Sequence, residues 1–240
     1  MKQVDVCLSP ELIHLYNLQH KIVVVVDILR ATSCMTAGLG SGVEAIHPVS
    51  ELDECRALMK DGYVGAAERG GQKVGGFDIG NSPFSYMDPM YQGKKIAVTT
   101  TNGTVAIEKS KSADQVVIGS FLNISAVAKY VSEQNQDLII LCAGWKGRVN
   151  LEDTLFAGAL CELIEADFAL NCDAAIGATA LYKSVKANLA EFLDQSSHVQ
   201  RLKGFNIQKD IEYCLTQDQF NIIPVLRGDE LVINKNDTQK

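Results

Sequence analysis

Five consecutive apolar, β-branched residues, Ile22–Val26, constrain the fold of this chain more than any other segment. An uninterrupted run of this kind is typical of a strand buried on both faces, as in a parallel sheet. Asp27 follows the strand directly, and Arg30 and a small polar pair open the next segment. Ligands of open α/β sheets bind at that edge, where the following helix offers N–H groups to an anion. We therefore place Asp27 at a functional site, with a capping or loop role as the alternative.

Length, charge and cysteine usage exclude several classes of protein. A chain of 240 residues is long enough for one large α/β domain or for two small lobes that share a core. A net charge of −7 without a basic run argues against nucleic acid as a partner. No apolar stretch approaches the roughly 20 residues that span a bilayer, and the first residues lack the apolar region of a signal peptide. Seven scattered cysteines without a C-x-x-C motif fit free thiols in a reducing cytoplasm. We expect a cytoplasmic protein without a membrane partner.

Strand-like and helix-like segments alternate along the chain. The predicted strands are Val4–Leu8, Ile22–Ile28, Ala45–Val49, Tyr63–Ala67, Lys95–Thr100, Gln115–Gly119 and Asp137–Ala143. The predicted helices include Leu52–Lys60 behind a capping box of Ser50 and Asp53, Ala126–Gln134, Asp153–Asp167 and a helical stretch from Ala174 to about Gln217. Ile222–Val225 and Glu230–Ile233 are predicted to form a hairpin. This pattern predicts a three-layer α/β/α fold with a mostly parallel or mixed sheet. We expect residues 1–240 to form a single α/β domain, with two tightly coupled lobes and the site between them as the alternative.

A second polar segment, Lys94–Thr104, ends a predicted strand in small hydroxyl, amide and glycine residues. Thr100, Thr101, Asn102 and Gly103 stand just before a predicted helix and could surround a phosphate with hydrogen-bond donors. The alternative is a β-rich strand followed by an ordinary Asn-Gly turn, which the threonines would satisfy equally well.

A third segment, Asp137–Asp153, repeats this arrangement around the only tryptophan, Trp145. Its loop carries Arg148 and leads to Glu152 and Asp153 at the start of a helix. Carboxylates at a helix start stabilise the helix dipole, and this is the alternative to a functional role for the two acids. Arg148 could equally be a solvated loop charge.

The fourth segment, Gly65–Pro83, is a long glycine-rich loop that contains Glu68, Asn81 and Ser82. Loops of this length are usually either functional or disordered, and its apolar residues argue against disorder. Because Glu68 directly follows a predicted strand, it is a second candidate metal carboxylate. A surface loop acid is the alternative.

Several catalytic motifs are missing. The four histidines show no H-x-H or H-E-x-x-H spacing, so zinc is not expected, and each histidine is interpreted as a surface or satisfied buried residue. The chain has neither a G-x-S-x-G elbow nor a P-loop. Carboxylates with hydroxyl and amide donors remain, and these suit Mg²⁺ and an anionic substrate.

Four of these segments together resemble one family. VVVVDILRATS, GFDIGNSP, VTTTNGT and CAG…DTLFAGAL are similar to motifs of the 2-phosphosulfolactate phosphatase (ComB-like) family, and the resemblance runs from Val4 to about Pro224. It implies that family's own α/β fold and Mg²⁺-dependent hydrolysis of (R)-2-phospho-3-sulfolactate to 3-sulfolactate and phosphate, on the route to coenzyme M. The partner would be a small anionic phosphoester, and a homodimer stays open.

The resemblance also implies a set of site residues. The catalytic and metal-binding carboxylates would be Asp27, Glu68 and Asp153; the substrate-binding residues would be Arg30, Asn81, Ser82, Thr100, Thr101 and Asn102, to which the loops add Gly103 and Arg148. Asp27 could attack phosphorus or bind a metal that activates water. The second route is favoured, because Leu29 stands where haloacid-dehalogenase phosphatases place a second Asp.

Two other functions stay open at this point. The chain could hydrolyse a different small phosphorylated 2-hydroxy acid. It could also be a non-catalytic protein that binds a phospho-ligand, although three retained acids argue against an anion binder.

Overall fold

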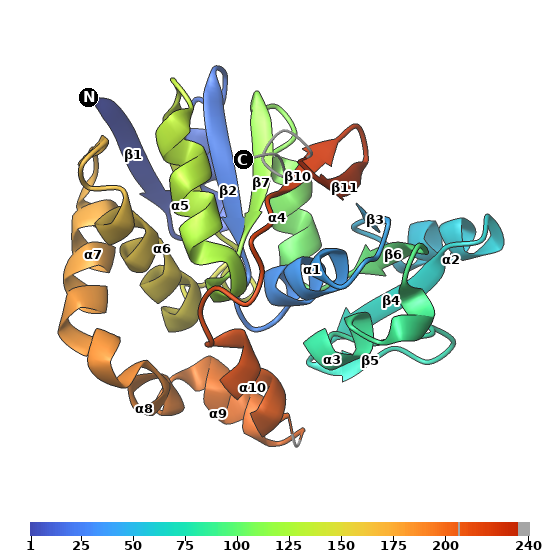
Figure 1. Ribbon diagram of the computed structural model, residues 1–240. Helices are drawn as coiled ribbons and strands as arrows, with labels where there is room; N and C mark the ends of the chain where they lie inside the picture. Colours follow the sequence, from blue (N-terminus) through green and yellow to red (C-terminus); the bar gives the residue numbers. More distant parts are fainter. Residues whose placement is uncertain (206, 235–240) are drawn as a thin grey trace.

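The computed structural model describes residues 1–205 and 207–234. Within them the strands form one sheet in the order β5-β4-β6-β3-β11-β10-β7-β2-β8-β1-β9 (Figure 1). The strands are β1 (Lys2–Cys7), β2 (Lys21–Val26), β3 (Ala45–Pro48), β4 (Val64–Arg69), β5 (Gln72–Lys73), β6 (Lys95–Thr99), β7 (Gln115–Gly119), β8 (Asp137–Cys142), β9 (Phe168–Leu170), β10 (Pro224–Arg227) and β11 (Glu230–Ile233). Most neighbouring strands are parallel and the others are antiparallel, so the sheet is mixed, as predicted.

Helices cover both faces of this sheet. The α-helices are α1 (Ala31–Gly40), α2 (Leu52–Lys60), α3 (Pro83–Tyr86), α4 (Gly103–Lys109), α5 (Ile124–Glu133), α6 (Leu151–Leu163), α7 (Asp173–Val185), α8 (Leu189–Asp194), α9 (Ser197–Lys203) and α10 (Gln208–Cys214). Short 3₁₀ helices are η1 (Pro10–Leu15), η2 (Pro89–Tyr91), η3 (Phe121–Asn123) and η4 (Lys186–Asn188). None of the helices in the described ranges is long and apolar enough to cross a membrane.

Strand β2 lies at the centre of the apolar core, between β7 and β8 and parallel to both. Val24 and Val26 join a core cluster with residues of α5, α6 and α7, whereas Val23 and Val25 join a second cluster with residues of α1 and α4. Alternate side chains of a strand point to opposite faces, so β2 must be apolar throughout. The three-layer α/β/α architecture is confirmed.

A C-terminal hairpin joins two parallel parts of the sheet. Strands β4, β6 and β3 form one part, and β7, β2, β8, β1 and β9 form the other. The antiparallel pair β10–β11 lies between them: Val225 pairs with Val117 of β7, and Leu231 pairs with Ile46 of β3. The hairpin predicted over residues 222–233 is therefore present, and it makes the sheet continuous.

Two local predictions differ from the structure, and two short strands were not predicted. The helical stretch after residue 173 is divided into α7, η4, α8, α9 and α10, because the chain must turn to follow the edge of the sheet. The capping box before α2 is formed by Glu51 and Glu54, one residue later than the predicted Ser50 and Asp53. Strands β5 and β9 are too short, at two and three residues, to give a sequence pattern.

Candidate active site

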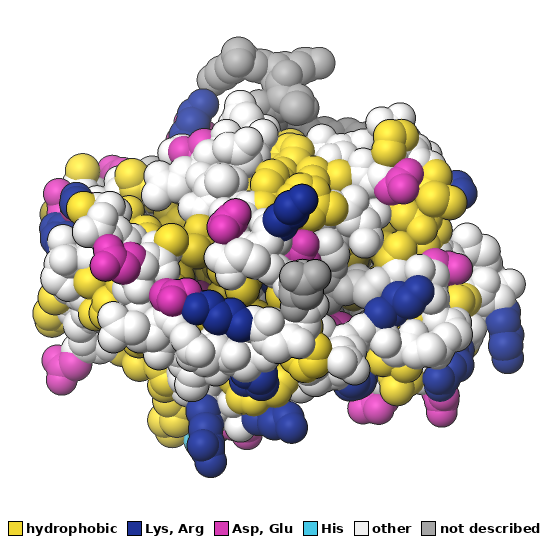
Figure 2. All heavy atoms as spheres, turned by 90° about the horizontal axis from the view of Figure 1, so that it is seen from below, with side chains coloured by type: hydrophobic (Ala, Val, Ile, Leu, Met, Phe, Trp, Pro, Cys, Tyr) yellow, Lys and Arg dark blue, Asp and Glu magenta, His cyan; other side chains and the backbone are white. Residues whose placement is uncertain are grey.

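The carboxyl ends of β2, β4, β6 and β8 converge on one small buried cavity. Its lining includes Asp27, Glu68, Asn81, Asn102, Trp145 and His198. The cavity volume is about 10 Å³, close to what a single water molecule needs. Seen from this side, the surface carries interspersed Lys, Arg, Asp and Glu side chains and no large patch of one sign (Figure 2). Selectivity for an anion must therefore come from buried groups.

The carboxylate of Asp27 lies at the N-terminus of α1. Its Oδ1 accepts a hydrogen bond from the backbone N–H of Ala31 at 3.3 Å. We expected this helix to present its first N–H groups to a free anion. It presents them to Asp27 instead. At Gly103 an added Cβ would lie 2.8 Å from Oδ2, so only glycine leaves room for this carboxylate. Burial raises the pKa of Asp27 to about 6; His198 opposes the rise, and Glu68 adds to it.

Glu68, at the end of β4, is held by the loop that follows β6. Its carboxylate accepts hydrogen bonds from the backbone N–H of Gly71 and from the N–H and hydroxyl of Thr101, the latter two at 3.3 Å. Thr100 and Thr104 bond to each other, each N–H donating to the other hydroxyl at 3.2 Å. The structure thus places Thr101 as a support for Glu68, and the hydroxyl of Thr100 within the turn rather than in the cavity.

Asp153 is fully buried and acts as a clamp between two strand ends. Its Oδ1 accepts from the N–H of Ile28 at 2.8 Å, and its Oδ2 accepts from the N–H of Gly144 at 3.0 Å. Burial and the nearby Glu152 and Asp27 raise the pKa of Asp153 well above its ordinary value. Both oxygens are therefore committed to the chain segments that follow β2 and β8.

The predicted metal site of three carboxylates is not assembled. Within residues 1–205 and 207–234, no three His, Cys, Asp or Glu side chains come together so as to hold a metal ion. Asp153 does not line the cavity: its carboxylate lies between the backbone amides of Ile28 and Gly144. Asp27 and Glu68 both line the cavity, however, and Mg²⁺ is commonly held by one or two carboxylates together with water and substrate phosphate. The donor set fits a magnesium ion of that kind.

Arg30 and Ser82 share an acidic partner on α10. Arg30 forms a buried ion pair with Asp210, and the Ser82 hydroxyl donates to the same carboxylate at 3.1 Å. Arg30 also reaches the carbonyl of Gly71 at 3.3 Å. Because its charge is already neutralised, Arg30 is a weaker candidate for substrate binding than the sequence suggests.

The remaining predicted substrate residues are divided by the fold. Asn81 lines the cavity, and its buried Oδ1 has no hydrogen-bond partner in the described part of the chain. Asn102 also lines the cavity and accepts from the N–H of Lys146 at 3.0 Å. Arg148 is exposed on the Trp145 loop and does not line the cavity. Its predicted role in binding is therefore not supported.

One residue outside the predicted set lines the cavity, and a second, fully buried one is bonded to it. His198, at the start of α9, lines the cavity and bonds through Nδ1 to Glu152. Glu152 is fully buried and also accepts from the side-chain amide of Asn150 at 2.9 Å. The histidine is buried and paired, as expected, but its position at the site was missed, because no sequence spacing links residue 198 to residue 152.

Arg201 lies behind His198 on the same helix. Its guanidinium carbon is 3.4 Å from the ring centroid of Trp145. Burial lowers the pKa of Arg201, and the acids Glu152 and Glu68 oppose that shift. Nε and Nη2 of Arg201 are buried, and no atom of the described residues accepts a hydrogen bond from them. A buried donor without a partner costs about 1–3 kcal/mol, so this is an unusual state for a cation.

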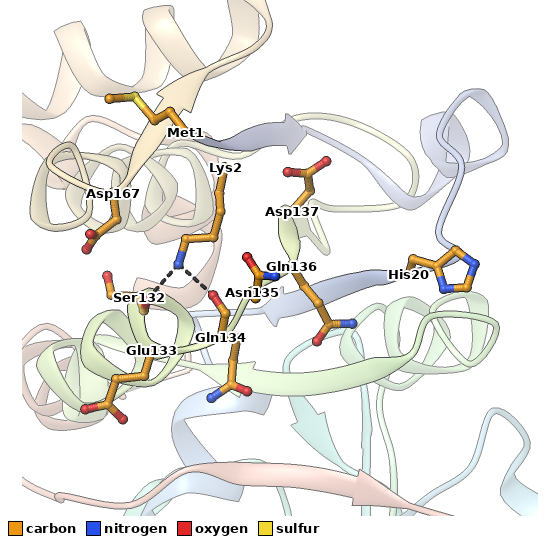
Figure 3. Close-up of a pocket in the computed structure, with 10 residues that line it drawn as sticks. All are labelled: Met1, Lys2, His20, Ser132, Glu133, Gln134, Asn135, Gln136, Asp137 and Asp167. Atoms are coloured by element: carbon orange, nitrogen blue, oxygen red, sulfur yellow. Dashed lines mark hydrogen bonds between the residues drawn. The ribbon is translucent and has the colours of Figure 1, made fainter.

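A larger pocket lies at the opposite, amino edge of the sheet (Figure 3). Its volume is about 720 Å³, and Lys2 is one of the residues that line it. The ammonium of Lys2 donates to three carbonyls at the end of α5, those of Val131, Ser132 and Gln134, at 3.1, 2.6 and 2.7 Å. Lys2 therefore caps a helix C-terminus and has no donor left for a ligand.

Comparison with known proteins shows which family the chain is similar to. The model of a family described as 2-phosphosulpholactate phosphatase matches residues 7–229. A protein named "Probable 2-phosphosulfolactate phosphatase" from Caldanaerobacter subterraneus subsp. tengcongensis is 42% identical over 218 residues, 88% of this chain and 90% of that protein. A protein of the same name from Thermotoga petrophila is 38% identical over 223 residues, 93% of this chain and 95% of its own length. One from Clostridium acetobutylicum is 34% identical over 236 residues, covering 96% and 100% of the two chains.

Proposed function

The chain belongs to the 2-phosphosulpholactate phosphatase family, and on that premise we propose that it hydrolyses (R)-2-phospho-3-sulfolactate to 3-sulfolactate and phosphate. This makes it a phosphoric monoester hydrolase. The observation that carries the proposal is the buried cavity where Asp27, Glu68 and His198 meet. Two acids and a carboxylate-bound histidine at the carboxyl edge of an α/β sheet supply what hydrolysis of a phosphoester needs.

A magnesium ion is part of this proposal. Asp27 and Glu68 are the residues that would hold it, because both line the cavity and each places carboxylate oxygen there. When bound, Mg²⁺ neutralises phosphoryl charge and lowers the pKa of a water molecule. Without a cation, the two acids repel an anionic substrate. The same repulsion between negative charges is seen where Glu68 raises the pKa of Asp27.

Each protein side chain has a distinct part in the reaction. The oxygen of water forms a bond to phosphorus, the bond from phosphorus to the C2 oxygen breaks, and the departing alkoxide takes up a proton. Of the two protons of the water molecule, one stays on the phosphate that is formed, and the other is released and replaces the proton given to the alkoxide. We assign that proton to His198, because this residue lines the cavity, and the bond from Nδ1 to Glu152 fixes the ring and leaves Nε2 for the substrate. Glu152 positions the histidine, and Asp27 contacts the phosphoryl group.

The substrate needs more room than one water molecule occupies. A neighbouring groove of about 550 Å³ shares Arg30, Gly71 and Asn81 with the cavity and is the proposed way in. Ser82 lines this groove, so its bond to Asp210 fixes the entrance.

The test is phosphate release from a panel of phosphorylated 2-hydroxy acids, with Mg²⁺ and with EDTA. We expect 2-phosphosulfolactate to have the highest kcat/KM and activity to disappear on chelation. Faster turnover of another phosphorylated 2-hydroxy acid would transfer the assignment to that substrate. Full activity after exhaustive EDTA treatment would exclude the magnesium proposal.

We further propose that the reaction takes place in a reducing cytoplasm and supplies sulfolactate on the route to coenzyme M. All seven cysteines are free, and six of them are buried. Free thiols in this number are typical of proteins in reducing compartments.

A further inference from the structure

Two arginines near the cavity differ in how their charge is used. Arg30 is neutralised by Asp210, whereas Arg201 forms no ion pair with any described residue and keeps two buried donors unpaired. A guanidinium in this state is ready to accept an anion, since the ligand would supply the hydrogen bonds that the protein does not. We infer that Arg201 binds the non-reacting oxyanion of the substrate, a sulfonate or a carboxylate, and thereby determines substrate specificity; this inference rests on the proposed function.

Arg201 does not itself line the cavity, but it lies close to Trp145 and His198, which do. His198 and Arg201 are three residues apart on α9, so they lie on the same face of the helix. Trp145 contacts both: its ring centroid is 5.5 Å from that of His198 and 3.4 Å from the guanidinium carbon of Arg201. The indole packs against the guanidinium, whose Nε and Nη2 have no acceptor among the described residues. One face of α9 thus carries His198, the proposed proton donor, and next to it the planar guanidinium of Arg201 with its hydrogen-bond donors.

The charges around Arg201 favour the binding of an anion other than the phosphoryl group. Glu152 and Glu68 act on Arg201 electrostatically, yet neither forms an ion pair or hydrogen bond with it in the described chain. The phosphoryl group is expected between Asp27 and Glu68. A second oxyanion, one or two carbon atoms from the ester oxygen, would therefore reach toward the Trp145 wall. A planar guanidinium binds such a group through two parallel hydrogen bonds.

The experiment compares Arg201→Gln and Arg201→Lys with wild type on three substrates: 2-phosphosulfolactate, 2-phospholactate and p-nitrophenyl phosphate. For 2-phosphosulfolactate we expect KM to rise about 10- to 100-fold in Arg201→Gln, as for loss of a charge-assisted pair, and less in Arg201→Lys. For p-nitrophenyl phosphate, which has no second anion, KM should change less than about 3-fold. Lys203→Gln is the matched control, because it removes one positive charge from the same helix at an exposed ion pair with Asp194. It should match wild type on all three substrates.

The substrate series also identifies the anion. A defect that disappears with 2-phospholactate assigns the sulfonate to Arg201, and a defect that persists assigns the carboxylate. An equal loss of kcat with all three substrates would overturn the inference, because Arg201 would then act on the phosphoryl group. Unchanged kinetics with all three would overturn it as well.

Product binding separates this inference from the proposed function. Calorimetry measures the Kd of 3-sulfolactate for wild type and for Arg201→Gln, with circular dichroism as the check on folding. If wild type does not bind 3-sulfolactate and does not hydrolyse its phosphoester, the proposed substrate is wrong. If wild type binds 3-sulfolactate and Arg201→Gln binds it equally well, the proposed substrate stands and the role of Arg201 is wrong.

Discussion

A pocket lies at each of the two edges of the sheet, with a buried or partly buried cation in it or beside it. The two cations differ in how many of their hydrogen-bond donors have a partner. At the amino edge Lys2 donates to three carbonyls in a pocket of about 720 Å³. At the carboxyl edge Arg201 has two donors without a partner, beside a cavity of about 10 Å³. Native proteins rarely leave buried polar groups unpaired. In this molecule, unmet hydrogen-bonding capacity coincides with the proposed site, whereas the larger pocket does not.

The strongest test of this contrast removes the charge of Asp27. We expect Asp27→Asn to lower kcat by at least about 10³, as loss of a principal catalytic group does, while the protein stays folded. The measurement is phosphate release under saturating substrate, with thermal unfolding as the control. A folded variant that keeps more than a tenth of wild-type turnover would show that Asp27 only caps α1.

The second prediction concerns the histidine at the same edge. His198→Gln should lower kcat for 2-phosphosulfolactate by about 10², a typical contribution of general acid catalysis. An aryl phosphate should be affected much less, because its leaving group departs without a proton. Glu152→Gln should give the same pattern with a smaller loss. Equal losses for alkyl and aryl esters would assign His198 a structural role instead.

The third prediction uses the raised pKa of Asp27 in metal-free protein. A carboxyl pKa of about 6 in the folded state, against 3.8 as the ordinary value, favours folding below pH 3.8, and that stability is lost as the pH rises through 6. Relative to Asp27→Asn, wild type should lose on the order of 2 kcal/mol of unfolding free energy between pH 4.5 and 7.5. Denaturant titrations in EDTA measure this difference. A difference that does not change with pH would contradict it.

The smallest expected effect belongs to the amino edge. Lys2→Met keeps the aliphatic stem but leaves three carbonyls of α5 without their donor. We expect a loss of about 1–2 kcal/mol in unfolding free energy and unchanged kcat and KM. Urea denaturation and steady-state kinetics on the same preparation test both parts. A change in KM would mean that the two edges are coupled, which would break the comparison.

Local patterns in the sequence predict the centre of the fold and half of the site. The apolar run of β2 must be buried on both faces, and Asp27 follows it directly, so its position at the carboxyl edge is a consequence of local structure. The same reasoning applies to Glu68 at the end of β4. These placements need only strand direction, which residue patterns encode.

The rest of the site depends on contacts between distant parts of the chain. Arg30 meets Asp210 across 180 positions, and Glu152 meets His198 across 46. Whether a charged side chain is free or neutralised depends on such partners, and no local pattern contains them. Asp153 shows the same limit: the family resemblance implies a metal ligand, but the structure places its carboxylate between two backbone amides and outside the cavity.

The hairpin β10–β11 has a consequence for how this protein is made on the ribosome. The parts of the sheet on either side of it are formed by earlier residues, but their edge strands β3 and β7 meet only through residues 224–233. Until that hairpin emerges, both edges expose unpaired backbone groups, and exposed strand edges promote aggregation. The nascent chain therefore carries two exposed strand edges from the completion of β7 until the hairpin is added. A chaperone that shields β3 and β7 during synthesis should raise the yield of native protein more than one that acts after release.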